Sequence, residues 1–332
     1  MKNLRQVRKP KFTSRPARTL GFSLLAVLAT AAVTASTASA SLPEWGGCEP
    51  AAPGHGKYSD PACVKKVTLA NKKTEGNYEW YTGAAFGFVH QRENGHPPSL
   101  GLQSYHFGEN EEGPIQIGKS TFETAAHKKM ECQDGSIYFL LENANTKGVR
   151  EVWLSLHGCE SEGLPCRNNG SLEEGEISNE EQWLQAEGLK GTLGYISGKG
   201  TEHPVVGLSL TAFNTKSENI EQRRLLFATC EAPGPESVGN LEIGGNKRGG
   251  NAVIALVTPV DQMATEHTLT YTQSAGVQTP SAFEGKTGGL MGFTESTWQP
   301  LGFETSFVIR PEGRSEPERW TQEAPIEIKA IP

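Results

Sequence analysis

The sequence predicts a mainly β protein, an antiparallel β-sandwich or barrel preceded by a small disulfide-bound N-terminal module. The 332 residues include 38 glycines and 20 prolines, which divide the chain into short segments. Within these segments apolar and polar residues alternate, as a strand with one buried face requires. No long segment shows the 3.6-residue period of an amphipathic helix. Short alternating runs separated by turn residues are typical of sandwiches and barrels.

The first forty residues predict an export signal. Residues 1–20 contain seven lysines and arginines and no acid, and an apolar stretch follows from Gly21 to Ala35. Small residues end the segment at Ala38-Ser39-Ala40, so we expect cleavage after Ala40 and a secreted or envelope-associated mature protein. The alternative is an uncleaved anchor, but a membrane-spanning helix needs roughly 20 apolar residues. We therefore expect no integral membrane segment in the mature chain.

The charge of the mature chain argues against nucleic acid as a partner. The leader holds seven of the 31 basic residues and none of the 38 acids, so 24 basic residues remain and the net charge becomes −14. Nucleic-acid binding depends on basic side chains that neutralise phosphates. An acidic surface is more typical of a soluble exported protein.

Six cysteines follow the leader, and an even number in an oxidising compartment predicts three disulfides. Spacing favours a bond between Cys48 and Cys63 across a Pro/Gly-rich segment. It also favours a bond between Cys159 and Cys166 across a short loop, which leaves Cys132 to pair with Cys230. No C-x-x-C occurs and no histidine lies at ligand spacing from two cysteines, so we expect no metal site and no other cofactor.

Alternation places the individual strands. In "HTLTYTQ", Leu269 and Tyr271 face one way and the threonines face the other. In "VVGLSLTAF", every second residue from Val206 belongs to the inner set. The predicted strands are Ser136–Glu142, Glu151–His157, Gly191–Ile196, Val205–Phe213, Arg224–Cys230, Ala252–Val257, Thr265–Gln273 and Phe303–Ile309.

The strands and cysteines suggest a division of the mature chain. We expect a cystine-containing module at 41–109, an antiparallel β domain at 110–285 and a C-terminal extension at 286–332. The charged, turn-rich segment Arg310–Glu323 predicts a loop. The final "PIEIKAI" alternates again, which predicts that the chain returns to the sheet.

The segment "GPIQIGKST", Gly113–Thr121, matches the phosphate-loop pattern G-x-x-x-x-G-K-[ST]. A phosphate loop needs a buried strand before it and a helix after it. The preceding "SYHFGENEE" is too polar for a buried parallel strand. The best candidate for the magnesium-positioning acid is Asp261, but Pro259 interrupts the run before it. We therefore expect no nucleotide partner.

Several phrases of the chain resemble a family of secreted, functionally uncharacterised proteins of soil actinobacteria. They are "GKYSDPACVKK", "GNYEW", "TFETAAHKKMEC", "GCESEGLPC", "GTLGYISG" and "VTPVDQMATEHTLTY…AFEG", and the likeness extends from about Leu42 to Gly285. Where this chain has Ala126 and His127, the family carries two glycines. The resemblance thus implies a hairpin that ends in a disulfide cysteine, with Lys119 and Ser120 leading into its first strand. It implies no activity.

Candidate catalytic residues are few. The nucleophile elbow G-x-S-x-G is absent, and disulfides remove the cysteines as nucleophiles. Among eight histidines, His157 differs because it ends an apolar strand two residues before Cys159, although a structural role is the more common one. Paired carboxylates serve glycoside hydrolysis. The segment "SLEEGEISNEEQ" supplies five glutamates, Glu173, Glu174, Glu176, Glu180 and Glu181, but such clusters are usually solvated turns.

Aromatic residues offer a second type of site. Tyr78 and Trp80 of "NYEWYTG" share one strand face, and sugar rings stack on such pairs. Covering the core of the small module is the more frequent use of aromatic side chains, and we expect it here. We also expect Trp153 of "EVWLSL" to be buried.

These observations favour an exported, non-enzymatic protein whose rigid scaffold presents a binding surface to polysaccharide or to another protein. The alternative is a secreted hydrolase of envelope or soil polymers that acts through Glu173, Glu174 and Glu176.

Overall fold

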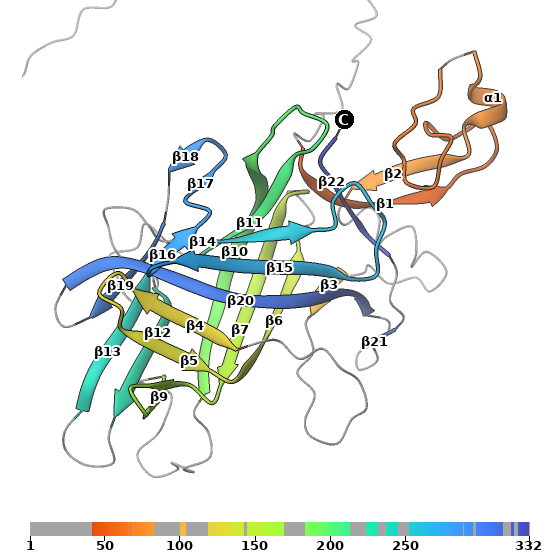
Figure 1. The fold of residues 1–332 in the computed structure, drawn as a ribbon. Helices are drawn as coiled ribbons and strands as arrows, with labels where there is room; N and C mark the ends of the chain where they lie inside the picture. Colours follow the sequence, from red (N-terminus) through yellow and green to blue (C-terminus); the bar gives the residue numbers. More distant parts are fainter. Residues whose placement is uncertain are drawn as a thin grey trace, which may run out of the picture. The chain divides into compact units, whose positions relative to one another are not determined.

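The computed structural model confirms the mainly β, antiparallel prediction. In the residues that the structure describes, the strands form a curled sheet of 17 strands, a second sheet of three and a hairpin of two, and the one helix, α1, has four residues, Lys72–Glu75 (Figure 1). The described residues are 42–68, 70–82, 100–103, 119–142, 145–168, 183–212, 224–231, 237–244, 252–287, 289–294, 297–314, 320–321 and 325–331. The predicted signal segment lies outside them.

Eight strands of the curled sheet pair in a circuit of antiparallel ladders, each with the next and the last with the first. Three of them, β14, β15 and β20, run side by side in Figure 1. The circuit curls the sheet and gives it an inner face. In order, its strands are β6 (Asp134–Leu141), β7 (Gly148–His157), β10 (Trp183–Ser197), β11 (Val205–Thr211), β14 (Ala252–Thr258), β15 (His267–Ser274), β20 (Thr297–Arg314) and β3 (Leu100–Gln103).

The 18-residue strand β20 belongs to a second circuit as well. From β20 this circuit passes through β4 (Ser120–Thr124), β5 (Lys129–Cys132), β8 (Glu160–Ser161), β9 (Leu164–Arg167), β12 (Arg224–Glu231), β13 (Ser237–Gly244) and β19 (Leu290–Thr294). Shorter strands complete the structure: β16 (Val277–Thr279) beside β15, β21 (Trp320–Thr321) beside β20, and the hairpin of β17 (Ala282–Phe283) and β18 (Lys286–Thr287).

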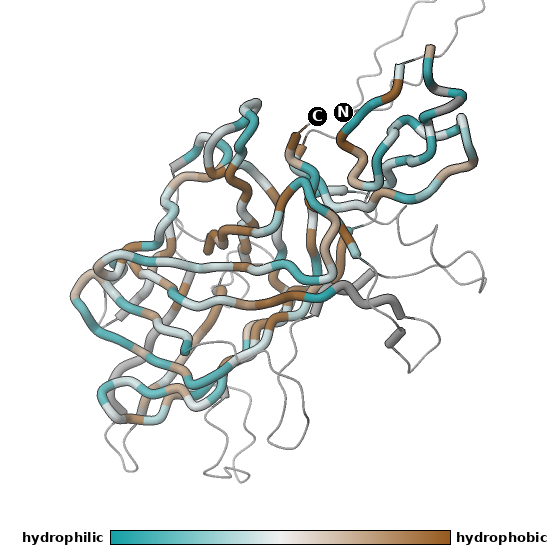
Figure 2. Tube along the Cα trace, turned by 45° about the vertical axis from the view of Figure 1, so that its right-hand side comes forward, coloured by the Kyte–Doolittle hydropathy of each residue, from teal (hydrophilic) through white to brown (hydrophobic). Residues whose placement is uncertain are grey.

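Alternation along the strands produces one apolar core between the inner faces. On β11, Leu208 lies opposite Ala255 and Leu210 opposite Val253, and all four are buried. Figure 2 shows the hydrophobic segments along the strands and mostly hydrophilic turns between them. All eight predicted strands are confirmed, as parts of β6, β7, β10, β11, β12, β14, β15 and β20.

The end of the chain differs from the prediction in three places. Residues 310–314, expected in a loop, continue β20, because β3 supplies backbone partners as far as Gly313. Arg310 is accommodated there by an ion pair with Glu266, with 2.6 Å between Nη2 and Oε1. Trp320–Thr321, expected in the same loop, form β21. The final segment does return to a sheet, but to the three-stranded one.

That smaller sheet joins the two ends of the described chain. Its order is β2 (Tyr78–Thr82), β1 (Glu44–Pro50) and β22 (Glu327–Lys329). One face packs Trp45 and Ile328 into the main apolar core. The other face covers a small cluster around the Cys48–Cys63 disulfide. The C-terminal strand is therefore a structural part of the N-terminal module.

Charged side chains are buried in this smaller sheet. The Lys329 ammonium donates a hydrogen bond to the Cys63 carbonyl at 2.6 Å and lies over the rings of Tyr58 (4.4 Å) and Trp80 (4.7 Å). Glu327 is fully buried, and neither of its carboxylate oxygens has a hydrogen-bond partner in the described structure. Burial raises the pKa of Glu327 to about 7, although the Lys329 ammonium opposes the shift. A buried charge without a partner is destabilising.

The disulfides confirm one predicted pairing and correct two. Cys48 bonds Cys63 as expected, but Cys132 bonds Cys159 and Cys166 bonds Cys230. Cys159 and Cys166 do lie opposite each other across the β8–β9 hairpin, where the Cys166 amide donates to the Cys159 carbonyl. The sheet continues on both sides of this hairpin, to β5 and to β12. Each cysteine therefore bonds across to its outer neighbouring strand.

Non-reducing peptide mapping tests this corrected connectivity. We expect linked peptides that contain Cys132 with Cys159 and Cys166 with Cys230. The second bond spans 64 residues, so the double substitution Cys166→Ala and Cys230→Ala should lower the free energy of unfolding by about 4 kcal/mol in the chain-entropy model. A peptide that links Cys159 to Cys166 would contradict the arrangement.

The pH dependence of stability tests the burial of Glu327. Because its pKa in the folded protein lies above the ordinary value of 4.5, the folded protein keeps a proton that the unfolded chain releases. The stabilisation is fully present below pH 4.5 and is lost as the pH rises to about 7. Glu327→Gln removes this loss, so the variant should match the wild type near pH 4.5 and exceed it at pH 7.5, by on the order of 3 kcal/mol.

Chemical denaturation between pH 4.5 and pH 7.5 gives the free energy of unfolding of the variant and of the wild type, and the difference between the two is compared across this range. Burial lowers the pKa of His267 and raises that of Glu44, and both contributions cancel in the difference. A difference that does not grow with pH would show that Glu327 keeps its ordinary pKa.

Candidate functional site

One side of β6, β7 and β10 carries polar and aromatic side chains in register, and we call it the outer face. Alternate residues of β6 and β7, such as Ile137, Leu154 and Leu156, are buried on the opposite side. Tyr138 lies directly opposite Trp153, Ser136 opposite Ser155, and Asp134 opposite His157, and Gln185 of β10 extends the middle row. The outer face is Asp134, Ser136, Tyr138, Trp153, Ser155, His157 and Gln185.

Trp153 is the most prominent residue of the outer face. It is 47% exposed, whereas Val152 and Leu154 on either side of it are buried. The prediction that Trp153 is buried is therefore wrong, because period-2 alternation places it opposite to the core residues of its own strand. Together with the half-buried Tyr138 it forms an aromatic surface. Tryptophan is highly buried on average, and an apolar ring with a polar N–H suits a ligand that has both apolar and polar groups.

The polar residues follow the aromatic pair along the strands. Trp153 and His157 are four residues apart, which corresponds to about 13 Å. His157 donates a hydrogen bond from Nδ1 to the Asp134 carboxylate, with 2.8 Å between Nδ1 and Oδ1. Between these rows lie the hydroxyls of Ser136 and Ser155 and the amide of Gln185, groups that both donate and accept. The outer face thus offers a flat ring surface followed by hydrogen-bonding groups.

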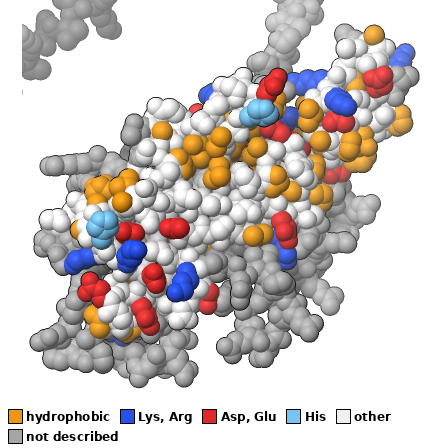
Figure 3. Space-filling view, in the orientation of Figure 1, with side chains coloured by type: hydrophobic (Ala, Val, Ile, Leu, Met, Phe, Trp, Pro, Cys, Tyr) orange, Lys and Arg blue, Asp and Glu red, His pale blue; other side chains and the backbone are white. Residues whose placement is uncertain are grey.

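A groove of about 420 Å³ adjoins the outer face at the Cys132–Cys159 disulfide. This volume falls within the range of small-molecule sites. We call it the charged groove, since both acidic and basic side chains line it. Figure 3 shows basic and acidic side chains side by side over β4 and β5. Its charged and amide side chains are Lys119, His127, Lys129, Glu131, Gln133, Glu160 and Glu162.

Two hairpins build this groove. In the β4–β5 hairpin His127 takes a φ of 62°, and its amide donates to the Thr124 carbonyl at 2.8 Å. In the β8–β9 hairpin Glu162 and Gly163 both have positive φ, as a two-residue type I′ turn requires. The hairpin implied by the resemblance is confirmed, and His127 adopts the backbone conformation that usually calls for glycine.

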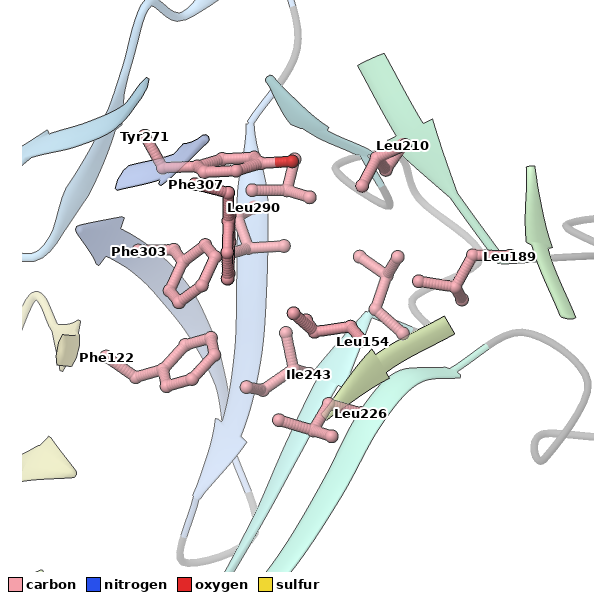
Figure 4. Close-up of a pocket in the computed structure, with 12 residues that line it drawn as sticks. Phe122, Leu154, Leu189, Leu210, Leu226, Ile243, Tyr271, Leu290, Phe303 and Phe307 are labelled. Atoms are coloured by element: carbon pink, nitrogen blue, oxygen red, sulfur yellow. The ribbon is translucent and has the colours of Figure 1, made fainter. Parts of the chain in front are cut away.

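The interior pocket inside the curled sheet is part of the core. Figure 4 shows the Tyr271 hydroxyl pointing into it among leucine and phenylalanine side chains. Its volume is about 20 Å³, room for about one water molecule. Among the described residues the Tyr271 hydroxyl has no hydrogen-bond partner, and burial raises its pKa. Since a buried water needs two to four polar partners, we expect this void to stay dry.

The phosphate-loop match has strand geometry where a nucleotide site needs a helix. Ser120 begins β4, is fully buried, and donates to the Thr305 hydroxyl at 2.8 Å. Asp261 accepts hydrogen bonds from the amides of Ala330 and Ile331. Lys119 lines the charged groove instead, and residues 113–118 lie outside the described structure.

The other candidates from the sequence divide as follows. His157 belongs to the outer face, and the sulfur of Cys159 is bonded to Cys132. Tyr78 and Trp80 pack on the cluster of the small module, as expected, and Trp80 Nε1 donates to Glu44 at 2.9 Å. The glutamate cluster Glu173, Glu174, Glu176, Glu180 and Glu181 lies outside the described residues.

Sequence reasoning missed the charged groove. Its residues span Lys119 to Gly163, and only the pairing of β5 with β8 brings the two hairpins together. Within the described chain, no group of three or more His, Cys, Asp or Glu side chains is arranged to hold a metal ion. A search of the same residues finds no helix of the length and apolar character needed to cross a membrane.

Comparisons with protein-family models, with curated proteins and with solved structures find no match. The resemblance to the secreted family therefore stays a prediction, and the geometry of the outer face carries the functional argument.

Proposed function

We propose that this protein is an exported, non-enzymatic binding module whose outer face binds an extended polysaccharide. The exposure of Trp153 carries the proposal. A pyranose ring has an apolar C–H face and a rim of hydroxyls, so it fits an aromatic surface with polar neighbours. A chain of such rings matches the line of outer-face side chains that extends along β7 for about 13 Å from Trp153 to His157.

Two further features support this proposal. Three disulfides in one chain are typical of proteins that work in an oxidising compartment, outside the cytosol. The outer face lies on paired strands and not on loops, which holds its side chains in fixed positions. The glutamates of the hydrolase alternative, Glu173, Glu174 and Glu176, lie outside the described structure.

Substitution of Trp153 tests the proposal. Trp153→Ala removes the ring surface and should weaken binding to wall polysaccharide roughly tenfold, the equivalent of about 1.4 kcal/mol. Trp153→Phe keeps a smaller ring and should give an intermediate affinity. Binding is measured by co-sedimentation with insoluble wall polysaccharide and by calorimetric titration with its soluble oligosaccharides.

The matched control is Val277→Ala on β16, which shortens another exposed apolar side chain. It should leave the affinity unchanged, and thermal unfolding should show that all three variants fold. Unchanged affinity in Trp153→Ala would reject the outer face as the site. Binding to a protein but to no glycan would reject the ligand class.

A further inference from the structure

The charged groove begins at the residues that adjoin one end of the outer face along the chain. Gln133 and Gly158 line the groove, and they are the immediate chain neighbours of Asp134 and His157. The Gln133 amide donates to the His157 carbonyl at 2.9 Å. Gly158 has a φ of 58°, and a Cβ built there would come within 2.8 Å of the Gln133 side chain, so this side chain lies across the junction. A ligand that covers Asp134 and His157 on the outer face would therefore meet residues of the groove next.

One part of the groove is basic. The side chains of Lys119, His127 and Lys129 are 73%, 70% and 53% exposed. His127 and Lys129 share a single acid, Glu123, at 2.9 and 3.6 Å, and Lys119 lies 3.9 Å from Glu131. Exposed ion pairs of this kind contribute little stability. The lysine ammonium groups thus remain able to bind an anionic group of a ligand.

The other part of the groove carries the acids Glu131, Glu160 and Glu162. Glu131 lies directly opposite Glu160 in the antiparallel pairing of β5 and β8. Like charges directly opposite each other are destabilising. In the described part of the chain, no basic side chain lies within ion-pair distance of Glu160 or of Glu162. Lys119, 3.9 Å from Glu131, offsets part of this repulsion, and a cationic group of a ligand beside Glu160 would reduce it further.

We propose that the ligand is a glycan that carries short peptide substituents, each with a free amine and a free carboxylate. The sugars lie on the outer face, and the peptide occupies the charged groove, with its carboxylate toward the lysines and its amine toward Glu160. A uniformly acidic or uniformly basic glycan would match only part of the groove and would be repelled by the rest. This inference rests on the proposed function and adds the ligand class to it.

Two forms of one glycan test the inference. The first is solubilised bacterial wall glycan that retains its peptides, and the second is the same glycan after enzymatic removal of the peptides. The folded mature protein should bind the peptide-bearing form roughly tenfold more tightly, a difference of about 1.4 kcal/mol. This preference should shrink at 1 M salt, because exposed charge pairs are screened.

Variants assign the preference to the groove. Lys119→Gln with Lys129→Gln, and separately Glu160→Gln with Glu162→Gln, should each reduce the preference several-fold while affinity for the stripped glycan is retained. Trp153→Ala should weaken binding of the peptide-bearing glycan and of the stripped glycan to the same extent. The matched control is Lys286→Gln with Glu202→Gln, an exposed acid and base that do not line the groove.

The outcomes distinguish failure of the peptide-bearing ligand from failure of polysaccharide binding. Equal affinity for both glycan forms would overturn the peptide-bearing ligand and leave polysaccharide binding intact. No binding to either form would overturn both. Binding to the free peptide alone, unaffected by Trp153→Ala, would also overturn both.

Discussion

The pairing register of β6 and β7 determines the position of six of the seven side chains of the outer face, and Gln185 follows from the pairing of β7 with β10. Ile137, Leu154 and Leu156 must face the core, and burial of one such side chain contributes about 1.5–3 kcal/mol. A slip by one residue would expose them and bury Trp153 and its polar neighbours. The hydrophobic core therefore specifies the outer face indirectly, and the ring of Trp153 remains at the surface as a consequence of burying Val152 and Leu154.

The long strand β20 and two disulfides fix the positions of the strands that form the charged groove. Because β20 pairs with β15 and β3 over one half and with β19 and β4 over the other, it links both circuits of the curled sheet. The Cys132–Cys159 and Cys166–Cys230 bonds hold the β8–β9 hairpin between β5 and β12. The charged groove is thus built on covalently fixed hairpins, which lowers the entropy cost of binding a ligand there.

Local features were predictable from the sequence and long-range ones were not. Alternation located the strands because a half-buried strand repeats every two residues, as in Leu269 and Tyr271. The pairing of Cys132 with Cys159 was not predictable, because it depends on which strand lies beside the β8–β9 hairpin. The error at Trp153 came from residue type, although its place between Val152 and Leu154 already indicated the outer side. The charged groove requires the β5–β8 contact, which no local pattern encodes.

Fluorine NMR of protein labelled with 5-fluorotryptophan tests directly whether wall glycan binds at Trp153. The six tryptophans give separate probes, and the variants Trp153→Phe and Trp45→Phe assign the two signals that matter. The account predicts that wall glycan shifts the Trp153 signal in a saturable way and leaves that of the fully buried Trp45 unchanged. Saturable binding with an unmoved Trp153 signal would contradict it.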